Sequence, residues 1–161
     1  NDLKNGGITK KPMNVLGYGN VRGVDMERFS PARFKATKNP DVFTFVFVGR
    51  IVGDKGINEL VEAFVKLHDK HNNTRLVLVG KYEHELDPVS GKTRKLIDTN
   101  DDIDACGPKY GDDLLQMYVN VDCFVMPSYR EGFPNTVLEA GAMGLPSIVT
   151  DSSVEECKCS V

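Results

Sequence analysis

The stretch VFTFVFVGRIVGDKGINELVEAFVKL, from Val42 to Leu67, decides the fold class. Its first eight residues are rich in β-branched and aromatic side chains, as in a strand that is covered on both faces. After a turn, apolar residues recur at helical spacing, at Ile57, Leu60, Val61, Phe64 and Leu67, with charges on the other face. This order of strand, turn and helix predicts the first unit of a parallel sheet.

The same alternation continues along the chain. Further strands are expected at RLVLVG (75–80), DIDACG (102–107), DCFVMP (122–127) and PSIVTD (146–151). Helices are expected around KTRKLID (92–98), DDLLQMYVNV (112–121) and NTVLEAGAM (135–143). We therefore predict an α/β fold, a doubly wound parallel sheet with helices on both faces. Ligands bind at the carboxyl ends of the strands in such sheets, so the strand-to-helix junctions are where a site is expected.

Composition limits the function classes. The chain has 161 residues, is 40% hydrophobic and carries a net charge of −3, which gives no electrostatic reason to expect a nucleic-acid or membrane surface. No apolar run approaches the ~20 residues of a membrane-spanning helix. The four cysteines suggest neither a disulfide framework nor a zinc site, so reduced cytosolic thiols are expected.

The chain divides into three parts. Residues 1–40 start without a methionine and read as the end of a missing N-terminal domain followed by an interdomain linker. Residues 41–151 form the expected sheet domain, which we interpret as truncated. Residues 152–161 are expected to be a disordered or non-native tail.

The first junction, GRIVGDKG, is a candidate phosphate site. Arg50 and Lys55 lie between the first strand and its helix, where exposed backbone N–H groups and the positive helix end would favour an anion. The spacing is not that of a P-loop, because Asp54 stands where the second glycine would be. The alternative is a solvated turn with two surface cations.

The junction after the fourth predicted strand, YREGFPNTVLEAGAMGLP (129–146), carries two carboxylates, Glu131 and Glu139. Two carboxylates at one strand end can accept hydroxyl hydrogens from vicinal diols such as those of sugars and ribose. The Asn135 side chain could cap the following helix. The alternative is that both glutamates are solvated, but the helix is small and apolar on several faces, where a lone carboxylate would be costly.

The junction after the third predicted strand, CGPKYGDD (106–113), is less informative. The backbone near Pro108 and Lys109 could meet the edge of a base, although proline has no N–H to donate. A simple turn explains this stretch equally well.

Together these stretches resemble the group 1 (glycogen-synthase-like) retaining glycosyltransferases. The resemblance runs from about Gly17 to Asp151 and includes the linker GVDMERFSP, VFVGRIVGDKG, RLVLVG and, above all, the E-x7-E pattern in REGFPNTVLEA. It implies a GT-B fold, in which two doubly wound domains enclose the active site, and this chain is similar to the C-terminal, donor-binding domain.

The resemblance implies roles for the site residues. Arg50 and Lys55 would bind the donor diphosphate and stabilise the leaving group, and Glu139 would bind the ribose. Glu131, with the backbone of Gly132, Phe133, Pro134 and Asn135, would hold the donor sugar and phosphates. The backbone near Pro108 and Lys109 would meet the base. No metal and no cofactor are implied, since cations and amides carry the electrostatic work on a UDP- or GDP-sugar substrate.

The function implied is sugar transfer from a nucleotide-diphosphate-sugar to a glycan or lipid-linked acceptor by a hexosyltransferase-type enzyme. EGFPN is a variant associated with capsule and exopolysaccharide biosynthesis, which predicts a cytoplasmic enzyme, peripheral to the inner face of the membrane at full length. These 161 residues alone are expected to be inactive. The alternatives are a GT-B sugar-nucleotide epimerase, or a non-catalytic flavodoxin-like module that binds phosphate or a partner.

Overall fold

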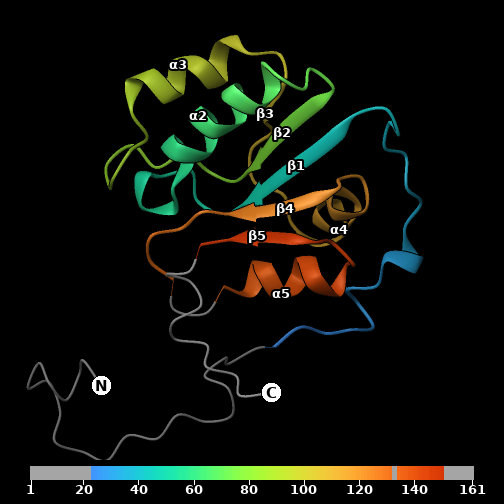
Figure 1. Cartoon of the computed structure of the whole chain (residues 1–161). Helices are drawn as coiled ribbons and strands as arrows, with labels where there is room; N and C mark the ends of the chain where they lie inside the picture. The colour runs from blue at the N-terminus through green and yellow to red at the C-terminus, as the bar shows by residue number, and fades with distance from the viewer. Residues whose placement is uncertain (1–22, 132–133, 151–161) are drawn as a thin grey trace, which may run out of the picture.

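The structure, a computed structural model, describes residues 23–131 and 134–150. Five strands form one parallel sheet in the order β3-β2-β1-β4-β5 (Figure 1). The strands are β1 (Phe43–Val48), β2 (Thr74–Val79), β3 (Ile103–Ala105), β4 (Cys123–Met126) and β5 (Ser147–Val149). The predicted fold class is confirmed, and each predicted strand is present.

Helices cover both faces of the sheet (Figure 1). They are α2 (Ile57–His68), α3 (Gly91–Thr99), α4 (Gly111–Val119) and α5 (Asn135–Ala142), with 3₁₀ turns η1 (Pro31–Arg33) and η2 (Gly53–Lys55). Residues of β1 alternate between two buried clusters: Phe47 packs with α2 and α3, whereas Val46 and Val48 pack on the side of α4 and α5. This alternation follows from the period of two in a strand, and burial on both sides explains why β1 is almost entirely apolar.

The strand order reverses next to β1. The chain moves outward from β1 to β2 and β3, then returns through α4 to place β4 on the other side of β1. The carboxyl ends of β1 and β4 therefore lie side by side at the point where the helices diverge to opposite faces. Such a switch point is where open α/β sheets bind their ligands.

The segment before β1 packs onto the domain. Phe29 and Phe34 lie against the cluster formed with α4 and α5, and the Thr37 N–H donates to Asn120 Oδ1 at 2.6 Å. Lys38 pairs with Asp122 at 2.6 Å. Residues that the sequence analysis assigned to a linker are thus attached to the sheet from Phe29 onward. No helix of residues 23–131 and 134–150 is long and apolar enough to span a membrane.

Candidate functional site

The first junction forms a tight turn that brings Lys55 to the switch point. The 3₁₀ turn η2 ends at Lys55, and Gly56 caps α2 in the left-handed conformation with φ of 68°. A Cβ atom at Gly56 would overlap the carbonyl oxygen of Pro127, at the end of β4. Glycine is required here both by the backbone angle and by this close approach.

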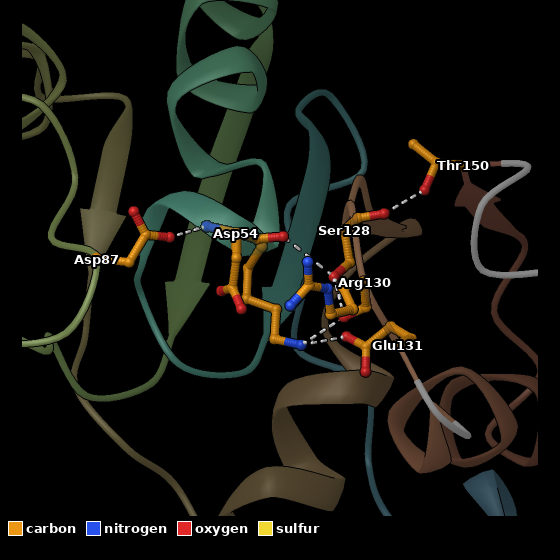
Figure 2. Close-up of polar contacts among 7 residues, drawn as sticks. Asp54, Asp87, Ser128, Arg130, Glu131 and Thr150 are labelled. Carbon is orange, nitrogen blue, oxygen red and sulfur yellow. Dashed lines mark hydrogen bonds and ion pairs between the residues drawn. The ribbon is translucent and has the colours of Figure 1, made fainter. Parts of the chain in front are cut away.

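Lys55 and Glu131 meet at this point. Lys55 Nζ lies 2.7 Å from Glu131 Oε1 and 3.2 Å from the carbonyl oxygen of Arg130, and the side chains of Lys55 and Glu131 are each only 15% exposed (Figure 2 shows Arg130 and Glu131). Such charge-assisted hydrogen bonds are stronger than neutral ones. The pair joins the turn after β1 to the loop after β4.

A cavity of about 210 Å³ opens beside this pair. Its lining comes from the ends of β1 and β4 and the start of α5, and consists of Phe47, Val48, Gly49, Lys55, Met126, Glu131, Pro134, Asn135 and Thr136. Four of the predicted site residues are therefore brought together, namely Lys55, Glu131, Pro134 and Asn135. Gly132 and Phe133, which were also predicted, lie outside the described residues.

The other predicted residues lie apart from this cavity. Arg50 Nη1 is 3.1 Å from Glu83 Oε2 in a largely exposed ion pair, and Arg50 is not among the described residues that line the cavity. Pro108 and Lys109 follow β3, two strands away from β1. Glu139 lies in α5, outside the described lining. Lys55 and Glu131 therefore contact each other, whereas Arg50 pairs with Glu83 on the loop after β2.

Five of the eight backbone N–H groups of the 49–56 turn are taken up within the protein and are not available to a phosphate, contrary to that part of the prediction. They donate within the protein at Gly49, Ile51, Gly53, Asp54 and Gly56. The acceptors lie mainly in β2 and the loop after it, because that loop folds along the turn. Lys55 is thus the group of this turn that faces the cavity with positive charge.

The predicted cap of α5 is wrong by one residue. Pro134 occupies the capping position without a side-chain capping hydrogen bond, and Asn135 is the first helical residue. Asn135 still lines the cavity at the start of the helix.

Glu139 is half-buried and lies beside Tyr118 of α4. Burial raises the pKa of Glu139 above its ordinary value, and the hydrogen bond from Tyr118 and the charge of Arg28 partly offset the rise. Tyr118 is fully buried and its hydroxyl donates to Glu139 Oε2 at 3.4 Å. Burial and the adjacent carboxylate raise the pKa of Tyr118, so its hydroxyl keeps its proton at neutral pH.

Three polar residues that support this site escaped the sequence analysis. Ser128 is fully buried, its hydroxyl donates to Arg130 O at 3.1 Å, and its carbonyl accepts from Thr150 Oγ1 at 2.7 Å (Figure 2). Asp87 accepts from the N–H of Asp54 on the opposite side of the turn (Figure 2). The buried Ser128, directly after a predicted strand, is the one that a strand-end search could have found.

The fold and the position of the cavity define a Rossmann-like α/β domain with a site at the switch point. The family model of glycosyl transferases group 1 matches residues 29–156. The chain therefore belongs to the group 1 glycosyltransferase family.

Two relatives in sequence are bacterial glycosyltransferases. The chain is 33% identical over 144 residues to the capsular polysaccharide biosynthesis glycosyltransferase CapM of Staphylococcus aureus, covering 86% of this chain and 37% of CapM. It is 31% identical over 138 residues to N,N'-diacetylbacillosaminyl-diphospho-undecaprenol alpha-1,3-N-acetylgalactosaminyltransferase of Campylobacter jejuni, covering 80% of this chain and 34% of that enzyme. The chain thus spans about a third of the length of these relatives.

Solved structures share the fold. The C-terminal domain of the group 1 family protein LpcC from Francisella tularensis superimposes with a TM-score of 0.63 at 21% identity, covering 83% of this chain and 73% of that one. The pneumococcal O-GlcNAc transferase GtfA, in complex with UDP and GlcNAc, gives a TM-score of 0.59 at 26% identity, covering 71% of this chain and 21% of GtfA.

Proposed function

We propose that this chain is the donor-binding domain of a retaining glycosyltransferase, and that the nucleotide-diphosphate-sugar binds at the cavity between β1 and β4. The observation that carries the proposal is the meeting of Lys55 and Glu131 at the switch point, where a cation and a hydroxyl acceptor lie side by side. A diphosphate binds to a cation, and sugar hydroxyls donate hydrogen bonds to a carboxylate.

Lys55 would bind the diphosphate and stabilise the negative charge that develops on the leaving group. The ammonium of Lys55 already pairs with the carboxylate of Glu131. The donor phosphate would replace Glu131 as the partner of Lys55, and Glu131 would then accept hydrogen bonds from sugar hydroxyls. Arg50 would leave Glu83 to join the phosphates. That exchange costs little, since exposed ion pairs contribute only about 0–1 kcal/mol.

Glu139 would bind the ribose hydroxyls. A carboxylate that burial has deprived of water has a strong tendency to accept new hydrogen bonds, and the raised pKa reports this loss of solvation. The backbone of residues 132–135 would contact the sugar and phosphates, and the backbone near Pro108 and Lys109 the base. We expect no metal ion and no cofactor besides the donor.

We further propose that the donor is a UDP- or GDP-sugar, and that the full-length enzyme extends a glycan or a lipid-linked acceptor in capsule or exopolysaccharide assembly. The names of the relatives and the UDP in the GtfA complex support these classes. The acceptor site would lie in the part of the relatives that this chain does not span. A cytoplasmic enzyme at the inner face of the membrane fits such acceptors.

Calorimetric titration of the chain with UDP, GDP and ADP tests the proposal. Selective binding of one nucleotide is expected, weakened about tenfold or more in Lys55→Ala and Glu139→Ala, because each removes a charged hydrogen-bonding partner worth about 1.5–3 kcal/mol. Lys92→Ala is the matched control, since Lys92 pairs with Glu62 on the surface of α2 and α3. If none of the three nucleotides binds, the proposal of a donor-binding domain is wrong, and a non-catalytic module that binds a partner is favoured.

A further inference from the structure

The loop between β2 and α3, residues 80–90, lies along the turn that carries Lys55. The Ile51 N–H donates to Lys81 O at 2.9 Å, and Ile51 also forms a parallel bridge with Tyr82. Arg50 pairs with Glu83 further along the same loop. The two segments are therefore joined at successive positions, although more than thirty residues separate them in sequence.

Asp87 makes the contacts nearest to Lys55. Its carbonyl oxygen accepts from the Gly53 N–H at 2.8 Å, and its Oδ2 accepts from the Asp54 N–H (Figure 2). These are the first two N–H groups of the 3₁₀ turn that ends at Lys55. A Cβ atom at Gly53 would come within 2.7 Å of Asp87 Oδ1, so glycine at this position allows the carboxylate to approach.

The backbone of Asp87 indicates that this contact is maintained at a cost. Among the described residues it is the one non-glycine residue with positive φ, at 53°. Aspartate tolerates this region better than most residues do, but such a conformation persists only where the surrounding structure fixes it. The end of the loop is fixed in turn, because the Ser90 N–H donates to Asn58 Oδ1 of α2 at 2.9 Å.

The opposite side of the same turn is fixed by the loop that carries Glu131. Asp54 O accepts from the Tyr129 N–H at 2.9 Å and from Ser128 Oγ at 3.4 Å. Asp54 is thus held through its N–H by Asp87 and through its carbonyl by the loop after β4, as Figure 2 shows for Asp87, Asp54 and Ser128. The backbone from which Lys55 reaches Glu131 is therefore held on both sides.

We propose that Asp87 is a positioning residue for Lys55: it fixes the Gly53–Lys55 turn so that the ammonium stays at the phosphate site. Asp87 is not among the described residues lining the cavity, so it acts through Lys55 and not on the ligand. The inference rests on the proposed function. It assigns a positioning role to the loop after β2, which contains none of the expected site residues.

The test compares UDP and GDP binding in variants of the 161-residue chain by calorimetry. Asp87→Ala is expected to weaken binding about tenfold. Asp87→Asn, which keeps a carbonyl acceptor and tolerates positive φ, should stay within about threefold of the native chain. Gly53→Ala, which displaces the carboxylate without removing it, should match Asp87→Ala. Glu85→Ala, an exposed carboxylate change in the same loop, should bind as the native chain does.

A double-mutant cycle separates positioning from a general loss of structure. If Asp87 acts through Lys55, Asp87→Ala has no further effect on binding in the Lys55→Ala background. The inference is overturned if the two effects multiply, if Asp87→Asn binds as weakly as Asp87→Ala, or if Asp87→Ala binds as the native chain does. In those cases a loss on Lys55→Ala alone leaves the proposed function standing. Native binding by Lys55→Ala overturns the proposed function itself.

Discussion

Glu139 is one residue through which the stability of this chain depends on pH. Burial raises its pKa above the ordinary value of 4.5, so the folded chain binds this proton more tightly than the unfolded chain does. The stability that the protonated form contributes is therefore fully present below the ordinary pKa and is lost as the pH rises through the folded-state pKa. At neutral pH the buried charge destabilises the fold.

Glu139→Gln is expected to increase the free energy of unfolding at pH 7 and to change it little near pH 4, because the amide removes the buried charge while keeping the shape. Urea unfolding at the two pH values measures the difference. The same variant should bind nucleotide about tenfold more weakly, since an amide accepts hydroxyl hydrogens less strongly than a carboxylate does. A variant that is less stable at pH 7 than the native chain would show that the charge is compensated in the fold.

Tyr118 opposes the rise in the pKa of Glu139 that burial causes. Its hydroxyl donates to the charged carboxylate and so lowers the pKa of Glu139 relative to burial alone. Tyr118→Phe is expected to raise that pKa further, which an NMR titration of the Glu139 side-chain carboxyl measures. The cost in stability should be about 1 kcal/mol, that of one hydrogen bond. An unchanged pKa would mean that the two groups do not interact in solution.

At the scale of the element, the junction between η2 and α2 depends on Gly56. Gly56→Ala is expected to destabilise the chain by at least about 2 kcal/mol, because a left-handed alanine costs about 1–2 kcal/mol and its Cβ overlaps Pro127 O. It should also weaken nucleotide binding, since Lys55 directly precedes it. Thermal unfolding and calorimetry measure the two effects.

Gly91→Ala is the control for that prediction. Gly91 begins α3, and a Cβ atom there meets nothing within 4 Å. Alanine is the better helix former, so this variant should be as stable as the native chain or more stable by up to about 1 kcal/mol. Equal losses of stability in Gly56→Ala and Gly91→Ala would indicate that the geometry of the junction between η2 and α2 does not cause the loss.

The elements themselves could be predicted from the sequence because their patterns are local. β1 shows an almost entirely apolar run and α2 an apolar stripe, and both lie where the periodicity predicts. The contacts of the 49–56 turn could not be predicted in the same way. Three of its N–H groups donate to Lys81 and Asp87, and Arg50 pairs with Glu83. No local pattern shows that a distant polar loop folds back along the turn.

The residues of the candidate site also fall into those that the sequence predicts and those that it does not. Lys55 and Glu131 were predicted because each follows a strand, and parallel strands bring their carboxyl ends to one edge. The positions of the other predicted residues depend on which strands become neighbours in the sheet. β1 and β4 are adjacent, whereas β3 lies two positions from β1. Lys109 therefore does not line this cavity, although it follows a strand end as Lys55 and Glu131 do.

For the whole molecule, nucleotide binding and sugar transfer are expected to need different lengths of chain. The chain spans about a third of its relatives' length, and a GT-B acceptor site would require the remainder. A glycosyl-transfer assay of these 161 residues against a panel of UDP- and GDP-sugars should show no product. The full-length protein should be active with one donor of the panel. Turnover by the 161 residues alone would refute the proposal that the acceptor site lies outside this chain.

The most direct measurement is chemical-shift mapping of the ¹⁵N-labelled chain during titration with UDP and GDP. We predict that the largest amide shifts fall on Lys55, Glu131 and Asn135, around the cavity between β1 and β4. Amides at the opposite end of the sheet, such as Thr44 and Asn120, should not move. Shifts centred on those residues, or no saturable shifts with either nucleotide, would contradict nucleotide binding at this cavity.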